Sequence, residues 1–186
     1  MIEENKDFDK LDFSTIKLER QYDCCTFTNC NFENIQIGNI TFIECEFVNC
    51  NFSNTKLNVT SFKETNFINC KLMGANFNDC NPFLLSFNFT DCDLTLASFY
   101  QLEIKNTSFN NCNLTEVDFT ETHLNNSSFK NSDLSKAIFS YTNLEKTDLS
   151  QAKNFNINPT TNKLKKTLFA KGNTDGLLNH LDIIIK

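Results

Sequence analysis

The chain has 186 residues, with 20 Phe, no Trp, only 4 Gly and 2 Pro, and a formal net charge of -6. This length suits one domain, and the acidic balance argues against a nucleic-acid-binding surface, which is normally basic. No run is long enough to span a membrane, and Met1 to Arg20 lacks the apolar core of a signal peptide, so we expect a cytoplasmic protein.

The first residues already carry an apolar side chain at every fifth position, at Phe8, Phe13 and Leu18. The next member of the series, Tyr22, comes one position early. We therefore expect an irregular first coil over residues 1–24, with a distorted junction to the repeats that follow.

A strict five-residue period dominates the middle of the chain. An apolar residue recurs from Phe27 to Phe77, and the series resumes at Leu84 and runs to Leu149, giving 25 central positions that are all Phe, Leu or Ile. The residue two before each centre is mostly small, and eight of the nine Cys lie there. Helices repeat at 3.6 and strands at 2, so period five indicates a coil of short flat sides ending in turns.

The residue types also predict how many sides each coil has. Sorting the centres by twenty gives uniform columns, such as Phe89, Phe109 and Phe129, whereas sorting by fifteen mixes Phe with aliphatic residues. The small positions exclude a period of ten, because Cys30 and Cys50 share a column with Ile40 between them. We predict four sides per coil, regular coils over 25–152, and like residues stacked about 4.8 Å apart.

A break interrupts the series between Phe77 and Leu84, where Asn81-Pro82 adds two residues. This predicts a bulge near residues 78–83. Three large residues around it, Phe83, Leu85 and Tyr100, suggest two interpretations: a locally repacked core beside the bulge, or an exposed apolar patch that faces a partner.

The last segment, residues 153–186, differs in charge and pattern. Residues 21–152 hold 15 acidic and 7 basic residues, a net charge of -8, whereas 153–186 hold 2 acidic and 6 basic, a net charge of +4. Asn158-Pro159 marks a loop, and Leu164 and Phe169 return to the five-residue frame. We expect a partial coil and then a short helix from Thr174 to about His180, followed by a β-prone tail, which together cap the first domain, residues 1–152.

The segments "CNFEN", "CNFSN", "ANFND", "CDLTL" and "CNLTE" resemble the pattern of the pentapeptide-repeat proteins, over residues 25–152. This resemblance implies an all-β fold, a right-handed quadrilateral β-helix. The stretches "FNINPTTNKLKKTLF" and "GLLNHLDIIIK" are similar to the C-terminal cap of the quinolone-resistance (Qnr/MfpA-like) branch. In that branch two rods pair tail to tail, which implies a homodimer interface at Leu177, Leu178, Leu181, Ile183 and Ile185.

The same branch binds DNA gyrase or topoisomerase IV as a DNA mimic and protects it from quinolones. Carried over, this implies a partner-binding acidic face made of outward carboxylates: Glu44, Glu46, Glu64, Asp79, Asp91, Asp93, Glu116, Asp118 and Glu121. Duplex DNA carries about 18 negative charges over ~30 Å, so a net charge of -8 makes a partial mimic at most. The alternatives are that these residues only solvate an acidic protein, or that the rod is a scaffold for another partner.

The sequence contains no recognisable catalytic set, and we predict no enzyme, no metal and no cofactor. The two His, His123 and His180, suit surface or packing roles better than catalysis. Stacked Cys such as Cys30, Cys50 and Cys70 fit disulfide or soft-metal chemistry on spacing alone. Exchange with Ala, Ser and Thr at the same repeat position favours small buried side chains instead.

Overall fold

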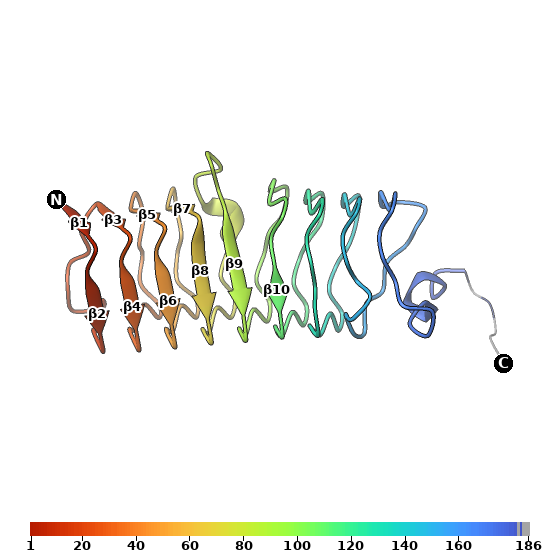
Figure 1. Cartoon of the computed structure of the whole chain (residues 1–186), viewed down its shortest axis with the longest axis horizontal. Coiled ribbons are helices and arrows are strands. Elements are labelled where there is room, and N and C mark those ends of the chain that lie inside the picture. Colours follow the sequence, from red (N-terminus) through yellow and green to blue (C-terminus); the bar gives the residue numbers. More distant parts are fainter. Residues whose placement is uncertain (182, 184–186) are drawn as a thin grey trace.

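The structure, a computed structural model, describes residues 1–181 and 183 and is a straight stack of coils with the two termini at opposite ends (Figure 1). Two walls of the stack are parallel sheets. One sheet has the order β1-β3-β5-β7, with β1 (Ile2–Glu4), β3 (Gln21–Asp23), β5 (Thr41–Ile43) and β7 (Ser61–Lys63). The other has the order β10-β9-β8-β6-β4-β2, with β2 (Asp7–Asp9), β4 (Thr26–Thr28), β6 (Glu46–Val48), β8 (Thr65–Ile68), β9 (Phe87–Thr90) and β10 (Phe109–Asn110).

Two further walls are held by isolated parallel bridges. We name the four walls after their first paired residues in one coil: the β3 wall, the β4 wall, the Asn31 wall and the Gln36 wall. Asn31 pairs with Asn51, and Gln36 pairs with Lys56. The coil that begins at Gln21 thus meets the next coil at four places within twenty residues, which confirms the prediction of four sides.

The register confirms the twenty-residue lap and both breaks in it. Tyr22 lies beside Phe42 and Phe42 beside Phe62, twenty residues apart. The first coil is one residue shorter, because Ile2 pairs with Gln21. The β8–β9 pair is two residues longer, because Thr65 lies beside Phe87. Each break therefore changes the length of one lap; the sheet of the β4 wall continues through the second break, whereas the sheet of the β3 wall ends at β7 before it.

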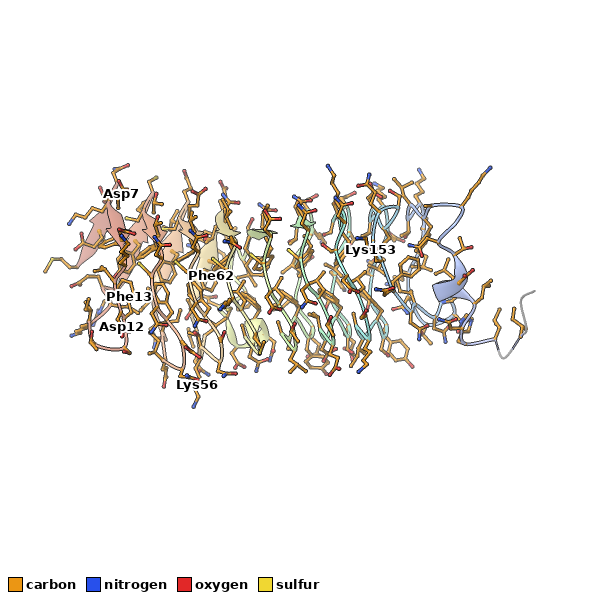
Figure 2. All side chains as sticks on the ribbon, turned by 90° about the horizontal axis from the view of Figure 1, so that it is seen from below. Asp7, Asp12, Phe13, Lys56, Phe62 and Lys153 are labelled. Carbon is orange, nitrogen blue, oxygen red and sulfur yellow. The ribbon has the colours of Figure 1, made fainter. Side chains whose placement is uncertain are left out.

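Stacked aromatic rings fill the core. Phe109 lies between Phe89 and Phe129, with ring centroids 5.3 and 4.9 Å away and ring planes within 12° of parallel. Rings from neighbouring walls meet edge to face, as Phe109 and Phe119 do at 5.8 Å. Burying each ring contributes about 2 kcal/mol before chain entropy is subtracted. In Figure 2, Phe13 and Phe62 lie between the walls and Lys56 points away.

The small inward residues satisfy the backbone between coils. The hydroxyl of Thr55 donates to the carbonyl of Phe32 at 2.6 Å, and the thiol of Cys50 donates to the carbonyl of Phe27 at 3.3 Å. Ala75 and Ala97 fill the same repeat position without a donor, and Ile40 and Phe87 are larger side chains that are buried there. Cys, Ser and Thr therefore suit this position because they are small and add a hydrogen bond.

The corners explain the abundance of Asn. The residue two after most centres has a positive φ, as at Asn29 (55°), Asn49 (56°) and Asn111 (53°). Asn tolerates this left-handed backbone better than most residues do. Only one corner uses glycine, Gly74 at +67°. The sequence therefore turns through Asn side chains rather than through Gly.

Two sequence predictions are wrong in the structure. Leu84, expected at an inward centre, is 64% exposed, and Leu85 is buried instead. The two extra residues form a turn in which the nitrogen of Phe83 donates to Asn81 Oδ1 at 3.0 Å and Leu84 has a φ of 59°. This segment rises above the rest of the rod between β8 and β9 (Figure 1).

The predicted helix from Thr174 to His180 is also too long. Besides η1 (Phe77–Asp79), the described residues contain one further helical element, the 3-10 turn η2 (Asp175–Leu177), and the Thr174 side chain makes no capping bond. A Cβ on Gly176 would lie 2.0 Å from the carbonyl oxygen of Phe155, so only glycine fits at this contact. Backbone packing against the last coil, rather than helix propensity, fixes the end of the rod.

Candidate protein-binding surfaces

The predicted acidic residues do not form one face. Glu44 and Glu64 stack on one corner, because Ile43 pairs with Lys63 directly before them. The remaining carboxylates belong to other walls and corners. Glu46 lies in β6, Asp93 on the Asn31 wall, Asp118 on the Gln36 wall, and Asp79, Asp91, Glu116 and Glu121 near other corners. The carboxylates are therefore distributed around the whole perimeter and do not form a continuous stripe.

Several of these carboxylates stabilise their own turns. Asp93 Oδ1 accepts from the nitrogen and hydroxyl of Thr95 at 3.1 and 2.6 Å. Asp79 accepts from the side chains of Asn76 and Asn78 at 3.1 and 3.4 Å. A carboxylate held in this way is less available to a partner than a free one, so the list of candidate contacts shortens.

Two further carboxylates are paired on the surface. Glu116 forms an ion pair with Lys136 at 3.0 Å, and Glu121 accepts from Gln101 at 2.9 Å. In each pair, the two side chains lie on one corner in neighbouring coils. Among the predicted acidic residues, Glu44 and Glu64 thus stand out as adjacent, exposed and outside every ion pair of the described residues.

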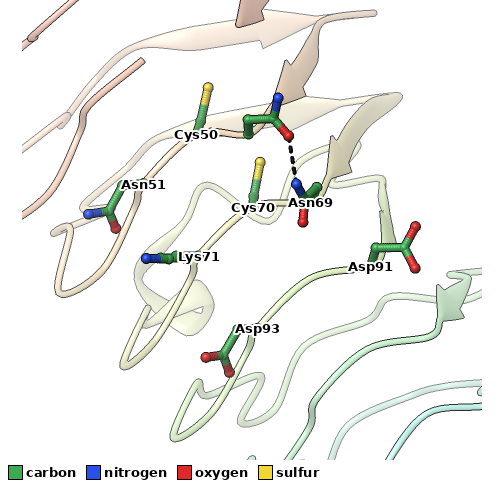
Figure 3. Close-up of a pocket in the computed structure, with 8 residues that line it drawn as sticks. Cys50, Asn51, Asn69, Cys70, Lys71, Asp91 and Asp93 are labelled. Atoms are coloured by element: carbon green, nitrogen blue, oxygen red, sulfur yellow. Dashed lines mark hydrogen bonds between the residues drawn. The ribbon is translucent and has the colours of Figure 1, made fainter. Parts of the chain in front are cut away.

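An asparagine ladder runs along the corner between the β4 wall and the Asn31 wall. Asn29 donates to Asp9 at 3.1 Å, Asn49 to Asn29 at 3.3 Å, and Asn69 to Asn49 at 2.7 Å. Asp91 follows, and a carboxylate cannot continue the ladder because it has no donor. A hollow of about 440 Å³ lies here, lined by Asn, Asp and Lys side chains and by Cys50 and Cys70 (Figure 3).

The bulge carries an exposed apolar patch that differs from the predicted one. Phe83 is 67% exposed and Tyr100 is 38% exposed, whereas the third predicted member, Leu85, is buried. Exposed Leu84 takes its place. The ammonium group of Lys63 lies 5.6 Å from the centre of the Phe83 ring, a cation–π contact that partly covers the ring.

The predicted dimer residues at the C-terminal end differ in exposure. Leu177 packs against the core and Leu178 is half-buried. Leu181 and Ile183 are about half exposed, at 48% and 55%. Ile185 lies outside the described residues. Pairing through this end stays a prediction.

The two histidines and the buried thiol of Cys45 have different surroundings. His123 lies on the surface with Nδ1 4.0 Å from Glu103, and both ring nitrogens of His180 are buried without a hydrogen-bond partner. Burial raises the pKa of the Cys45 thiol to about 12, so it stays protonated at neutral pH and is a poor nucleophile or ligand. All nine cysteines are free thiols.

No group of three or more His, Cys, Asp or Glu side chains in the described part of the chain could hold a metal ion. No helix there has the length and apolar character needed to cross a bilayer. What remains as candidate surfaces is the Glu44–Glu64 corner, the Phe83–Leu84 patch and the C-terminal end.

The repeated coils, their small inward donors and their left-handed corners define a solenoid built on a five-residue unit. The sequence model of the family described as "Pentapeptide repeats" matches with 8 copies, over residues 23–58, 45–81 and 112–151. The chain belongs to the pentapeptide-repeat family.

Solved structures share the whole fold. A trypsin-treated variant of QnrB1, described as a plasmid-mediated fluoroquinolone resistance protein, superposes with a TM-score of 0.77 at 15% identity, covering 100% of this chain and 92% of that one. A second trypsin-treated QnrB1 variant gives a TM-score of 0.66 at 14% identity, with 100% of both chains covered. At such identity the likeness concerns the fold. A comparison with curated proteins finds no match to this sequence.

Proposed function

We propose that this chain is a non-enzymatic binding protein whose acidic rod engages DNA gyrase or topoisomerase IV in the cytoplasm as a partial DNA mimic. The observation that carries the proposal is a straight rod whose coils hold a net charge of -8, with carboxylates on every side. Duplex DNA is likewise negative around its perimeter, so a partner that grips DNA meets negative charge whichever wall it approaches.

Shape and charge contribute differently to this proposal. Coils 21–152 span about 30 Å at one strand spacing per coil, where duplex DNA carries about 18 charges. The rod has less than half of that charge, so affinity also needs specific contacts. Phe83 and Leu84 are suited to supply them, because a few well-packed anchor residues near the centre of an interface carry most of its binding energy, and both side chains are exposed.

The fold shared with QnrB1 supports a role in quinolone sensitivity, and the cap supports pairing of two rods tail to tail. In this pairing Leu181 and Ile183 supply the exposed apolar contact. The proposed dimer doubles the length of the negative rod. It therefore brings the charge distribution closer to that of a DNA segment that passes through a topoisomerase.

A supercoiling assay tests the proposal. The purified chain, at micromolar concentration, is expected to slow gyrase supercoiling or to relieve its block by a quinolone. The Phe83→Ala, Leu84→Ala double variant should lose most of this effect, while the matched control Met73→Ala, on an exposed side chain of the Asn31 wall, should keep it. Absence of any effect by the unmodified chain, with or without drug, would contradict the proposal.

The exposed bulge also favours a second candidate, an interaction scaffold for another protein. Phe83 and Leu84 form an apolar patch, and such patches mark binding sites on soluble proteins. A pull-down that retains a partner through this patch and recovers no topoisomerase would favour the scaffold over the DNA mimic.

A further inference from the structure

One edge of the rod carries both signs of charge, separated along its length. The edge lies where the β3 wall turns into the β4 wall. The register of the coils places these residues in one column, which we call the charged edge: Cys24, Glu44, Glu64, Ser86, Asn106, Asn126, Lys146 and Lys166. The two acidic positions belong to one half of the rod and the two basic positions to the other.

The charges on this edge are arranged symmetrically about Asn106. Glu44 lies three coils before Asn106 and Lys166 three coils after it, while Glu64 and Lys146 lie two coils before and after. If the rod is turned end over end about Asn106, its two ammonium groups therefore take the positions of its two carboxylates.

The neighbouring column on the β3 wall, one residue before the edge, carries one further pair of opposite charges. Lys63 stands two coils before the midpoint and Glu145 two coils after it. At the midpoint itself stands Lys105, whose ammonium group is paired with Glu103 of its own chain. A reversed copy would thus place Lys63 opposite the partner's Glu145, while Lys165, three coils after the midpoint, would face the partner's apolar Ile43.

These charges have no ion-pair partner within the rod. Glu44, Glu64, Lys146 and Lys166 are all exposed. Among residues 1–181 and 183, none of these four takes part in an ion pair. A hollow of about 410 Å³ lies beside the edge and is lined by Leu84, Leu85 and Ile43 among others. The carboxylate of Glu44 accepts one hydrogen bond, from the Cys24 thiol at 3.9 Å. The edge therefore combines exposed charges outside these ion pairs with apolar surface that a partner would cover.

We infer that a second copy of this chain packs antiparallel along the charged edge, with a two-fold axis at Asn106. In this arrangement Glu44 faces the partner's Lys166, and Glu64 faces the partner's Lys146. Leu84 faces the partner's Asn125–Asn126. A parallel copy in register would place like charges opposite one another, which is unfavourable. The side-by-side pairing is distinct from the proposed tail-to-tail contact and does not depend on a topoisomerase partner.

Salt sensitivity is the signature of this pairing. Exposed ion pairs are individually weak and are screened over about 10 Å at 0.1 M salt. We expect the Cys24→Ser, Leu181→Asp chain, which lacks the apolar tail-to-tail contact, to sediment as a dimer at about 20 mM NaCl and as a monomer at about 500 mM, where screening acts over about 4 Å. The charge variants below are made in the same background.

Charge reversal gives the sharpest test. Two double variants reverse the charges: Glu44→Lys, Glu64→Lys and Lys146→Glu, Lys166→Glu. Each should lose the low-salt dimer, with a dissociation constant at least about tenfold higher than that of the chain with unreversed charges. An equimolar mixture of the two should dimerise again, because each supplies the charge that the other lacks. The matched control Asn111→Lys, Asn131→Lys, on a different corner, should stay dimeric at low salt.

A chemical cross-link then locates the axis. Asn106→Cys in the Cys24→Ser background should be joined to its own copy by a short bismaleimide, whereas Asn111→Cys should not. A monomer at low salt would overturn the inference. So would a low-salt dimer of the Leu181→Asp background that survives charge reversal, since its contact would then lie away from the charged edge. Either result leaves the gyrase assay unaffected.

Discussion

The regular coils and the segment from Asn81 to Ser86 use similar residues, yet they treat apolar side chains in opposite ways. In the coils every central Phe or Leu from Phe27 to Leu149 outside the break is buried in a column. In the segment, Phe83 and Leu84 point into solvent although Leu84 keeps the five-residue spacing. Spacing alone does not bury a residue: the chain must also pair with the coil on each side.

The strongest way to probe this contrast is to remove a ring from the regular core. Phe47 stacks on Phe27 and Phe67 at 4.8 and 5.1 Å and is fully buried. We expect Phe47→Ala to lower the free energy of unfolding by about 3–5 kcal/mol, because it leaves a cavity between two coils that cannot close. Urea denaturation followed by circular dichroism measures the loss, and a loss under 1 kcal/mol would contradict the columnar core.

A polar substitution in the same kind of inward position should cost less. Asn162 Nδ2 donates to the carbonyls of Phe139 and Asn158 at 3.1 and 2.8 Å, and its Oδ1 accepts from the nitrogen of Thr142 at 2.8 Å. Asn162→Ala leaves these buried groups unpaired and should cost about 1–3 kcal/mol. The same denaturation assay checks it, with exposed Asn156→Ala as the control that should change little.

The bulge should tolerate truncation. Leu84→Ala removes an exposed side chain and should change the free energy of unfolding by less than about 0.5 kcal/mol. Leu85→Ala, one residue later, should cost more because Leu85 is buried. If Leu84→Ala destabilised the fold as strongly as Phe47→Ala, the five-residue frame would extend through the bulge after all.

The smallest effect concerns acid stability. Burial disfavours ionisation of Asp133, but hydrogen bonds from Asn154 and Ser135 outweigh it and lower the pKa of this carboxyl. Its contribution to stability is therefore present above the unfolded pKa of about 4 and is lost as the pH falls through the lower folded value. Asp133→Asn should flatten the pH dependence of unfolding below about pH 4 and leave it unchanged at pH 7. An unchanged acid limb would contradict this role.

The sequence predicts the regular coils well because each small inward residue and each ring repeats twenty residues on. Cys30, Cys50 and Cys70 could be assigned to one column from residue types alone, and the register agrees. The exposure of Leu84 could not be predicted, because it depends on which positions of the coil accommodate the two inserted residues. An Asx turn at Asn81 decides that, and Asn is common throughout this chain.

The surfaces were harder to predict than the core. The sequence predicts that a carboxylate points outward. It does not show on which corner the carboxylate lies, or whether hydrogen bonds within its own turn occupy it. Asp93 and Thr95 illustrate the difference, because their hydrogen bond uses the charge locally. The pattern on the charged edge was missed for a related reason. Lys146 and Lys166 fall in the column of Glu44 only when the break between β8 and β9 is counted as 22 residues.

Distances between exposed corners test the twenty-residue lap most directly. Nitroxide labels carried by non-natural residues at positions 111 and 131 should show strong dipolar broadening, because these neighbours on one corner are joined by a hydrogen bond of 3.1 Å from Asn131 to Asn111. Labels at 111 and 126 lie on different corners and should show much weaker broadening. Stronger coupling in the 111–126 pair than in the 111–131 pair would contradict four walls and indicate three.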